Sequence, residues 1–224
     1  MPKQPDPMTM DLYGADRYEV APKWGPGMVS GPYSTNAAYF TAAADQPVTA
    51  MGCSVAFDEL AGHDRPWSSV TLVPWHAGPL TKTRLGQATP WHVSVTRSTV
   101  ALYVRQSTRG RLEQIDQMTF PDIAPNGAVT PVAVVQNKQV VACCIGEKVH
   151  VSRSPKYASA ERGYWPCWET YVYGIDQDPR PWFGQPWYIQ SAGSLTSSAW
   201  TREIRSLPQG ARSAATTAQA AAMG

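Results

Sequence analysis

One segment constrains the fold more than any other: WHVSVTRSTVALYVRQS, residues 91–107. Apolar residues fill every second position from Trp91 to Val95 and again from Val100 to Val104, and the polar stretch 97–99 separates the two runs. Successive side chains of a strand point to opposite faces of a sheet. The segment therefore predicts a β-hairpin with one buried face.

Short strand-like segments fill much of the remaining chain, and the 20 Pro and 17 Gly residues divide them with turn signals. We predict further strands over 37–43, 53–60, 67–78, 111–120, 131–137, 139–152, 168–175, 186–193 and 198–207. The almost continuous apolar character of 131–137 and 139–152 indicates strands covered on both faces. The pattern predicts an all-β fold, an antiparallel β-sandwich of the jelly-roll or concanavalin-like kind.

The two ends differ from this pattern. Residues 1–32 are broken by Pro and Gly but keep several large apolar side chains, which predicts an extended N-terminal arm. Residues 208–224, PQGARSAATTAQAAAMG, are small and of low complexity, so we expect an extended, disordered C-terminal tail. The expected organisation is therefore an arm over 1–32, a sandwich domain over 33–207 and a tail over 208–224.

Charge and hydropathy exclude some function classes. Lys and Arg number 19 against 17 Asp and Glu, for a net charge of +2, so strongly electrostatic nucleic-acid binding is not expected. There is no run of 18 apolar residues and no apolar core typical of a signal peptide near the N-terminus. We expect no membrane partner and synthesis in a cytosol. The four cysteines form no CxxC pair and are interpreted as buried free thiols.

Catalytic and metal-binding signatures are absent from the sequence. No GxSxG, Walker A or HExxH motif occurs. Weak candidates are the His63-Asp64 pair, the carboxylates Asp176 and Asp178 for a cation, and Glu113 with Asp116 for a glycosidase pair. His92 and His150 are interpreted as ordinary strand histidines. We predict no catalytic residue, no cofactor and no metal site.

Aromatic residues are the unusual feature: 9 Trp, 10 Tyr and 4 Phe. Four tryptophans, Trp165, Trp168, Trp182 and Trp187, fall within 23 residues. Three interpretations stay open. The rings fill the core, or they anchor a protein interface, where Trp and Tyr often dominate binding, or they form a flat platform on which sugars stack.

The order of segments resembles the concanavalin-like, laminin-G-type β-sandwiches over residues 37–207. The resemblance lies in AAYFTAAADQPVTAMG followed by CSVAFDEL, in WHVSVT at 91–96 followed by TVALYV, and in the late segments WYIQ at 187–190 and REIR at 202–205. Gln190 stands where that family has glycine, and its calcium-binding aspartates have no clear counterparts here. Such domains occur in bacteriophage tail and capsid-surface proteins.

This resemblance, together with the two arms, implies a non-enzymatic structural subunit of a virus particle. It would be a phage minor tail protein or a capsid-associated decoration protein, located in the virion, that binds other virion subunits through its arms. The alternative is a carbohydrate-binding module for host-surface glycans. A third hypothesis, a glycan hydrolase, requires two carboxylates across a cleft.

Overall fold

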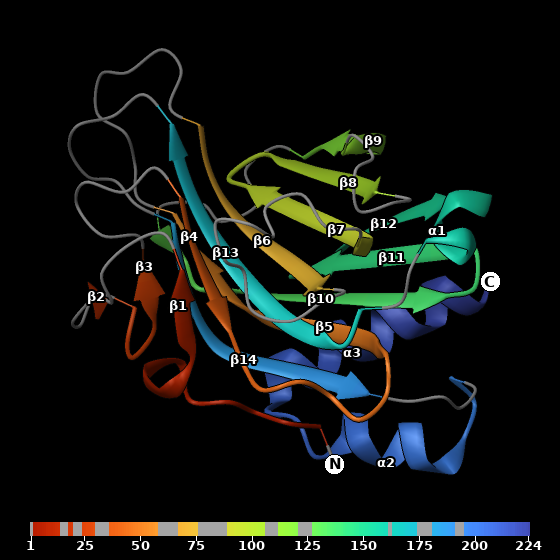
Figure 1. Cartoon of the computed structure of the whole chain (residues 1–224). Helices are drawn as coiled ribbons and strands as arrows, with labels where there is room; N and C mark the ends of the chain where they lie inside the picture. Colours follow the sequence, from red (N-terminus) through yellow and green to blue (C-terminus); the bar gives the residue numbers. More distant parts are fainter. Residues whose placement is uncertain are drawn as a thin grey trace.

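A computed structural model shows two antiparallel sheets packed face to face, with two helices against the outer side of one sheet (Figure 1). It describes residues 2–13, 18–19, 24–29, 36–57, 67–75, 89–105, 112–120, 127–160, 163–173, 181–190 and 195–224. The predicted all-β sandwich is confirmed. The elements outside the sheets are the 3-10 turn η1 (Pro7–Thr9) and the helices α1 (Pro155–Ser159), α2 (Ser198–Arg205) and α3 (Gln209–Met223).

Within the described ranges, each sheet has seven strands. Sheet I has the order β1-β4-β13-β6-β7-β8-β9, and sheet II has the order β12-β11-β10-β5-β14-β3-β2. The bounds are β1 Asp11–Tyr13, β2 Tyr18–Glu19, β3 Met28–Val29, β4 Asn36–Phe40, β5 Val48–Ala56, β6 Trp67–Trp75, β7 Thr89–Thr96, β8 Thr99–Arg105, β9 Glu113–Thr119, β10 Thr130–Asn137, β11 Val140–Ile145, β12 Lys148–Arg153, β13 Trp165–Tyr173 and β14 Trp182–Gln190.

The hairpin predicted within 91–107 is confirmed as β7 and β8, with Val95 opposite Val100 across the turn. The segment 139–152 differs from the prediction, because it forms two strands instead of one. Gly146 has a φ of +58°, a conformation that glycine adopts without steric cost, and it turns the chain from β11 into β12.

The main core lies between the sheets and is rich in aromatic rings. Trp168 of β13 stacks near Phe183 of β14, with ring centroids 6.4 Å apart. Tyr39 of β4 meets the same Phe183 edge-on at 5.2 Å. Such offset and edge-on pairs add to the stabilisation from burying the rings. Trp91 of β7, fully buried, extends this core under sheet I.

A second core lies between sheet II and the helices. The helix α3 contacts β10 and β11, whose strands are thereby covered on both faces, as the continuous apolar pattern predicts (Figure 1). Trp187 of β14 and Trp200 of α2 are both buried in this layer. Every second residue of β10 and β11 therefore faces a helix rather than water.

The C-terminal segments contradict two predictions. Residues 198–205 form the helix α2 and not a strand, because Ser197 caps the helix by accepting a hydrogen bond from Trp200 N at 3.1 Å. Trp200 and Ile204 are four residues apart and share the buried face. The extended, disordered tail is also wrong, because 209–223 form the helix α3 on sheet II. Its small buried residues let helix and sheet approach closely: Ala214, Ala215, Ala218 and Ala222.

The described part of the N-terminal segment is irregular and extended, but it lies on the protein's own sheets. Lys3 exchanges two backbone hydrogen bonds of 3.0 Å with Tyr188 of β14. The strand β1 pairs with β4, and β3 pairs with β14. Met10 is buried in the main core. Both ends thus add to the body of this one chain, which differs from the prediction of arms that reach other subunits.

Candidate functional site

The tryptophan cluster is mostly part of the packed interior. Trp168, Trp182 and Trp187 are only 0%, 2% and 1% exposed, so their rings cannot stack on a sugar or a partner protein at the surface. Trp165 is partly exposed. The core interpretation therefore holds for three of the four rings, and the predicted platform does not form from them.

Glycines make room for these rings. A Cβ on Gly52 would lie 2.4 Å from the Trp187 ring and 2.3 Å from Val132 O, closer than atoms can approach. Gly52 O accepts a hydrogen bond of 3.1 Å from Trp168 Nε1. One residue of β5 thus touches a tryptophan of each core.

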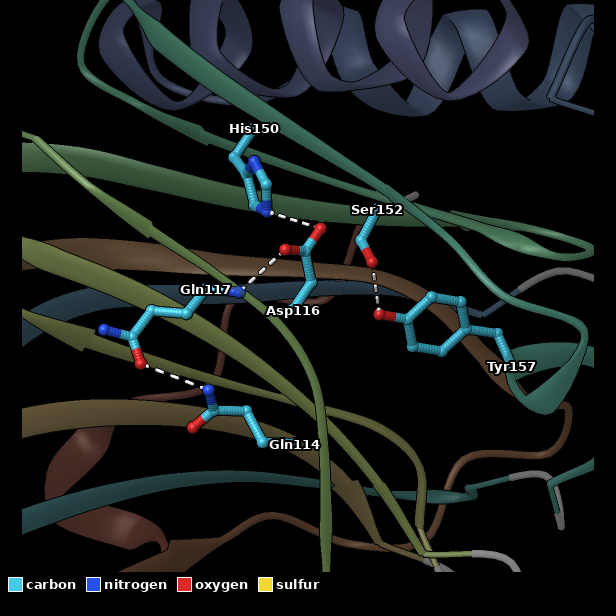
Figure 2. Close-up of polar contacts among 6 residues, drawn as sticks. All are labelled: Gln114, Asp116, Gln117, His150, Ser152 and Tyr157. Atoms are coloured by element: carbon cyan, nitrogen blue, oxygen red, sulfur yellow. Dashed lines mark hydrogen bonds and ion pairs between the residues drawn. The ribbon is translucent and has the colours of Figure 1, made fainter.

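The carboxylates Glu113 and Asp116 of β9 are not a catalytic pair. Asp116 Oδ2 lies 3.1 Å from Nε2 of His150, which is a buried residue of β12, and Asp116 Oδ1 accepts a 2.8 Å hydrogen bond from Gln117 N (Figure 2). Glu113 forms an ion pair with Lys156 of α1. Because each carboxylate is bound to a different basic side chain, the two do not share a substrate between them. Asp116 instead links the edge strands β9 and β12 of the two sheets, and Glu113 links β9 to α1.

A tyrosine closes the same edge. Tyr157 donates a 2.8 Å hydrogen bond to Ser152 Oγ (Figure 2). Burial, with a smaller contribution from Asp116, raises the pKa of Tyr157 to about 12, although the hydrogen bond to Ser152 opposes the shift. This phenol therefore stays protonated at neutral pH. The polar contacts at this edge therefore hold the two sheets together and do not form a catalytic site.

The other weak candidates give no site either. His63-Asp64, Asp176 and Asp178 lie outside the described residues. Within the described ranges, no three His, Cys, Asp or Glu side chains gather in a way that could hold a metal ion. The four cysteines are free and buried, as predicted: Cys53, Cys143, Cys144 and Cys167. No helix in the described part of the chain is long and apolar enough to cross a membrane.

The outer face of sheet I carries hydroxyl, aromatic and acidic side chains side by side. The helices α2 and α3 lie on the far side of sheet II, so neither covers this face (Figure 1). Across its middle the strand register aligns Glu169 of β13 with Thr71 of β6, and Thr71 in turn with Ser94 of β7. Thr71 Oγ1 donates a 3.3 Å hydrogen bond to Ser94 Oγ. Short hydroxyl side chains thus form the floor of this face, and they are buried: Ser69, Thr71 and Ser94 are only 2%, 3% and 8% exposed.

Larger polar side chains surround these hydroxyls on the same face. His92 of β7 pairs in register with Tyr103 of β8, and their ring centroids are 5.3 Å apart. Both are partly exposed, as are Glu169 and Tyr171 on β13. Burial raises the pKa of the Tyr103 phenol, so the group stays neutral and can donate as well as accept a hydrogen bond.

We define the open face as the outward side chains of β13, β6, β7 and β8 around this floor: Ser69, Thr71, His92, Ser94, Thr96, Tyr103, Glu169 and Tyr171. One end of the same sheet face is apolar and buried, with Phe40, Val73 and Cys167 packed together. The polar functional groups therefore gather over the middle strands.

The sequence contains a signal for this face in the alternation of polar and apolar residues. In 91–96 the residues His92, Ser94 and Thr96 alternate with the buried Trp91, Val93 and Val95. Interpreting His92 as an ordinary strand histidine overlooked its neighbours on the adjacent strands. Only the pairing of β13, β6, β7 and β8 brings Glu169, Thr71 and Tyr103 to the same face.

Comparison with known proteins identifies the fold. No protein-family model and no curated protein matches this sequence. Among solved structures, the chain is similar to a protein of unknown function with a galectin-like fold from Bacillus subtilis, with TM-score 0.58, 9% identity and coverage of 85% of this chain and 98% of that one. It is also similar to lectin II from Ulex europaeus, with TM-score 0.54, 11% identity and coverage of 85% and 94%.

A third similar structure is the CBM2 module of the evolved Dit of Lactobacillus casei BL23 phage J-1, with TM-score 0.50, 8% identity and coverage of 81% and 89%. At such low identities the likeness concerns the fold. The chain thus has the β-sandwich fold of galectin-like and concanavalin-like lectins, which agrees with the predicted resemblance.

Proposed function

We propose that this protein is a non-enzymatic carbohydrate-binding module and that it binds glycans on the open face. The observation that carries the proposal is a group of partly exposed side chains, the paired rings of His92 and Tyr103 together with Glu169, above buried hydroxyls on a sheet face that α2 and α3 leave uncovered. The similar fold of a lectin and of a phage carbohydrate-binding module supports it. This is the alternative hypothesis of the sequence analysis, relocated from the tryptophan cluster.

The chemistry of the face suits a sugar. Sugar rings present apolar C–H groups on their flat sides, which an aromatic ring such as Tyr103 can cover, and hydroxyl groups at their rims. The partly exposed His92 and Tyr103 offer groups that donate or accept hydrogen bonds at this face, whereas the hydroxyls of Thr71 and Ser94 are buried beneath them. Pockets that bind small molecules combine such a flat apolar surface with a few placed polar groups.

A glycan array, followed by calorimetry on the strongest ligand, tests the proposal. Tyr103→Ala should weaken binding at least about ten-fold, because it removes the half-buried ring that lies at a tilt against His92. The matched control is Tyr164→Ala, which removes an exposed tyrosine away from the open face. Absence of any signal on the array, or equal losses in both variants, would contradict the proposal.

A second candidate concerns where the module acts. The similarity to a module of a phage Dit favours a place in a bacteriophage particle, as a minor tail or capsid-associated decoration protein. Since the described parts of both ends lie on the chain's own sheets, attachment to other subunits would use the folded body. Electron microscopy with an antibody against the purified protein tests this: regular labelling of intact particles supports it, and unlabelled particles contradict it.

A further inference from the structure

The strand β9 places two glutamines beside the open face. Gln114 is the register partner of Tyr103, and Gln117 is the register partner of Ala101. Partners in register point to the same side of a sheet, so both glutamines lie on the outer face of sheet I. Both are exposed, whereas the hydroxyl side chains of the floor are buried. The accessible polar groups of this face therefore continue from Tyr103 onto β9.

A β-bulge puts the two glutamines on the same side of β9. Gln114 and Gln117 are three positions apart, so in a regular strand they would point to opposite faces. The register shifts at Ile115, which is the extra residue between the partners on β8. Figure 2 shows both glutamine side chains together on one side of β9, with Asp116 directed the other way, toward His150. Bulges that re-aim a side chain in this manner are common next to functional sites.

The two amides are ordered before any ligand arrives. Gln114 Nε2 donates a 3.2 Å hydrogen bond to Gln117 Oε1 (Figure 2). On the inner side of the strand, Asp116 binds His150 and ties β9 to sheet II. Side chains that are already held in place lose less conformational freedom on binding. The glutamine pair is therefore suited to recognising a ligand group of defined geometry.

We infer, on the basis of the proposed function, that Gln114 and Gln117 determine specificity by binding two neighbouring free hydroxyls of the sugar ring that covers Tyr103. Their mutual hydrogen bond does not use Gln114 Oε1, an acceptor, or Gln117 Nε2, a donor. If both amides were turned over, the pair would still offer one acceptor and one donor. A hydroxyl group both donates and accepts. Two adjacent ring hydroxyls therefore satisfy both amides, and a glycan substituted at either hydroxyl does not.

The strand spacing brings the glutamine pair within reach of that ring. Directly opposed residues of antiparallel strands have Cβ atoms about 5 Å apart, so Gln114 stands next to Tyr103. Ala101, which is opposite Gln117, has a short side chain that does not stand between Gln117 and the ring. One sugar ring over Tyr103 therefore contacts both amides, and recognition of the two hydroxyls needs no second ring.

The first test varies the sugar and uses the full chain. Methyl glycosides of glucose, galactose and mannose are compared by NMR titration with derivatives that carry a methyl group on one ring hydroxyl at a time. We expect one pair of neighbouring hydroxyls at which methylation weakens binding at least about five-fold. The side-chain NH₂ signals of Gln114 and Gln117, assigned with Gln114→Ala and Gln117→Ala, should shift on binding. Binding that moves neither signal, or that requires no such pair of hydroxyls, overturns the inference.

The second test varies the protein. Gln117→Ala should weaken binding about three- to ten-fold and should remove the preference for the unmethylated glycoside. Gln117→Glu, which keeps the size but loses the donor, should do the same. The matched control is Gln139→Ala, at an exposed glutamine in the turn between β10 and β11, which should change neither quantity.

The outcomes separate this inference from the proposed function. Thermal unfolding confirms that each variant folds, and the methylation preference is a ratio that a general loss of stability does not alter. If Tyr103→Ala weakens binding while the preference is unchanged in Gln114→Ala and Gln117→Ala, the inference is wrong and the proposed function stands. If neither the glycan array nor these glycosides show binding, the proposed function and the inference fall together.

Discussion

The outer faces of the two sheets differ although both sheets have seven antiparallel strands. The outward residues of sheet II are apolar, such as Val135, Ala142 and Ile189, and they are buried under the helical layer of α2 and α3. Those of sheet I are hydroxyl, aromatic and acidic over the middle strands. The difference indicates a division of labour: one face stabilises the fold by burial, and the other carries groups suited to a ligand.

This difference also explains why the helices cover the outer face of sheet II and not that of sheet I. Apolar area removed from water stabilises by roughly 25 cal/mol per Å², so the outward side of β10 and β11 gains from a helix laid across it. The open face would gain little from such a cover, because its partly exposed imidazole, phenol and carboxylate groups would lose hydration when buried. Whether these roles are separate can be tested by perturbing each face in turn.

The largest effect is expected from the helical layer. Trp200→Ala removes a ring that is 1% exposed between α2 and sheet II, and should lower the free energy of unfolding by about 3–5 kcal/mol. Urea unfolding followed by circular dichroism measures it. The control Thr216→Ala, at an exposed position of α3, should change stability by less than about 0.5 kcal/mol. A loss below about 1 kcal/mol for Trp200→Ala would show that the helices contribute little to the fold.

A smaller effect is expected from added volume. Ala215 of α3 is fully buried against sheet II, and Ala215→Leu should cost about 1–3 kcal/mol because the closely packed layer has no room for the larger side chain. The same kind of change on the outer side of sheet I, Gln117→Leu at an exposed position of β9, should cost less than about 0.5 kcal/mol. Similar losses at both positions would remove the distinction between the faces.

The smallest effect is expected at alkaline pH. Burial under the helical layer raises the pKa of Cys144 from its ordinary value of 9.0 to about 11. A raised pKa gives stability that is fully present below the unfolded value and is lost as pH rises through 9 to 11. Between pH 8 and 11, Cys144→Ala should lose less stability than the natural protein in urea titrations. Identical pH slopes would contradict this assignment.

Much of the fold could be predicted from the sequence, because strand alternation is a local signal. The hairpin of β7 and β8 and the doubly covered β10 and β11 follow directly from it. The helices were missed for two reasons. The segment around Trp200 and Ile204 is short enough to resemble a strand, and the alanines of α3 acquire a role only when a sheet lies beneath them.

Most of the candidate site could not be predicted from the sequence. The four tryptophans are conspicuous in the sequence, yet Trp168, Trp182 and Trp187 are core residues. Trp182 and Trp187 also need glycines beside them: Gly27, Gly52 and Gly184. The open face joins residues from β6, β7, β8 and β13, about a hundred positions apart along the chain. Which strands become neighbours is decided by the whole topology, and single-strand patterns do not contain that information.

Because the chain is synthesised from its N-terminal side, β5 cannot pair with β14 until much of the later sequence has been made. These adjacent strands are separated by more than half of the sequence, and α3, which covers β10 and β11, is made after both of them and after β14. Until then the nascent polypeptide carries two strands that are apolar on both sides and unsheltered. Such segments associate readily with other chains. Production of this protein should therefore depend on slow translation, low temperature or chaperones more than its finished stability would suggest.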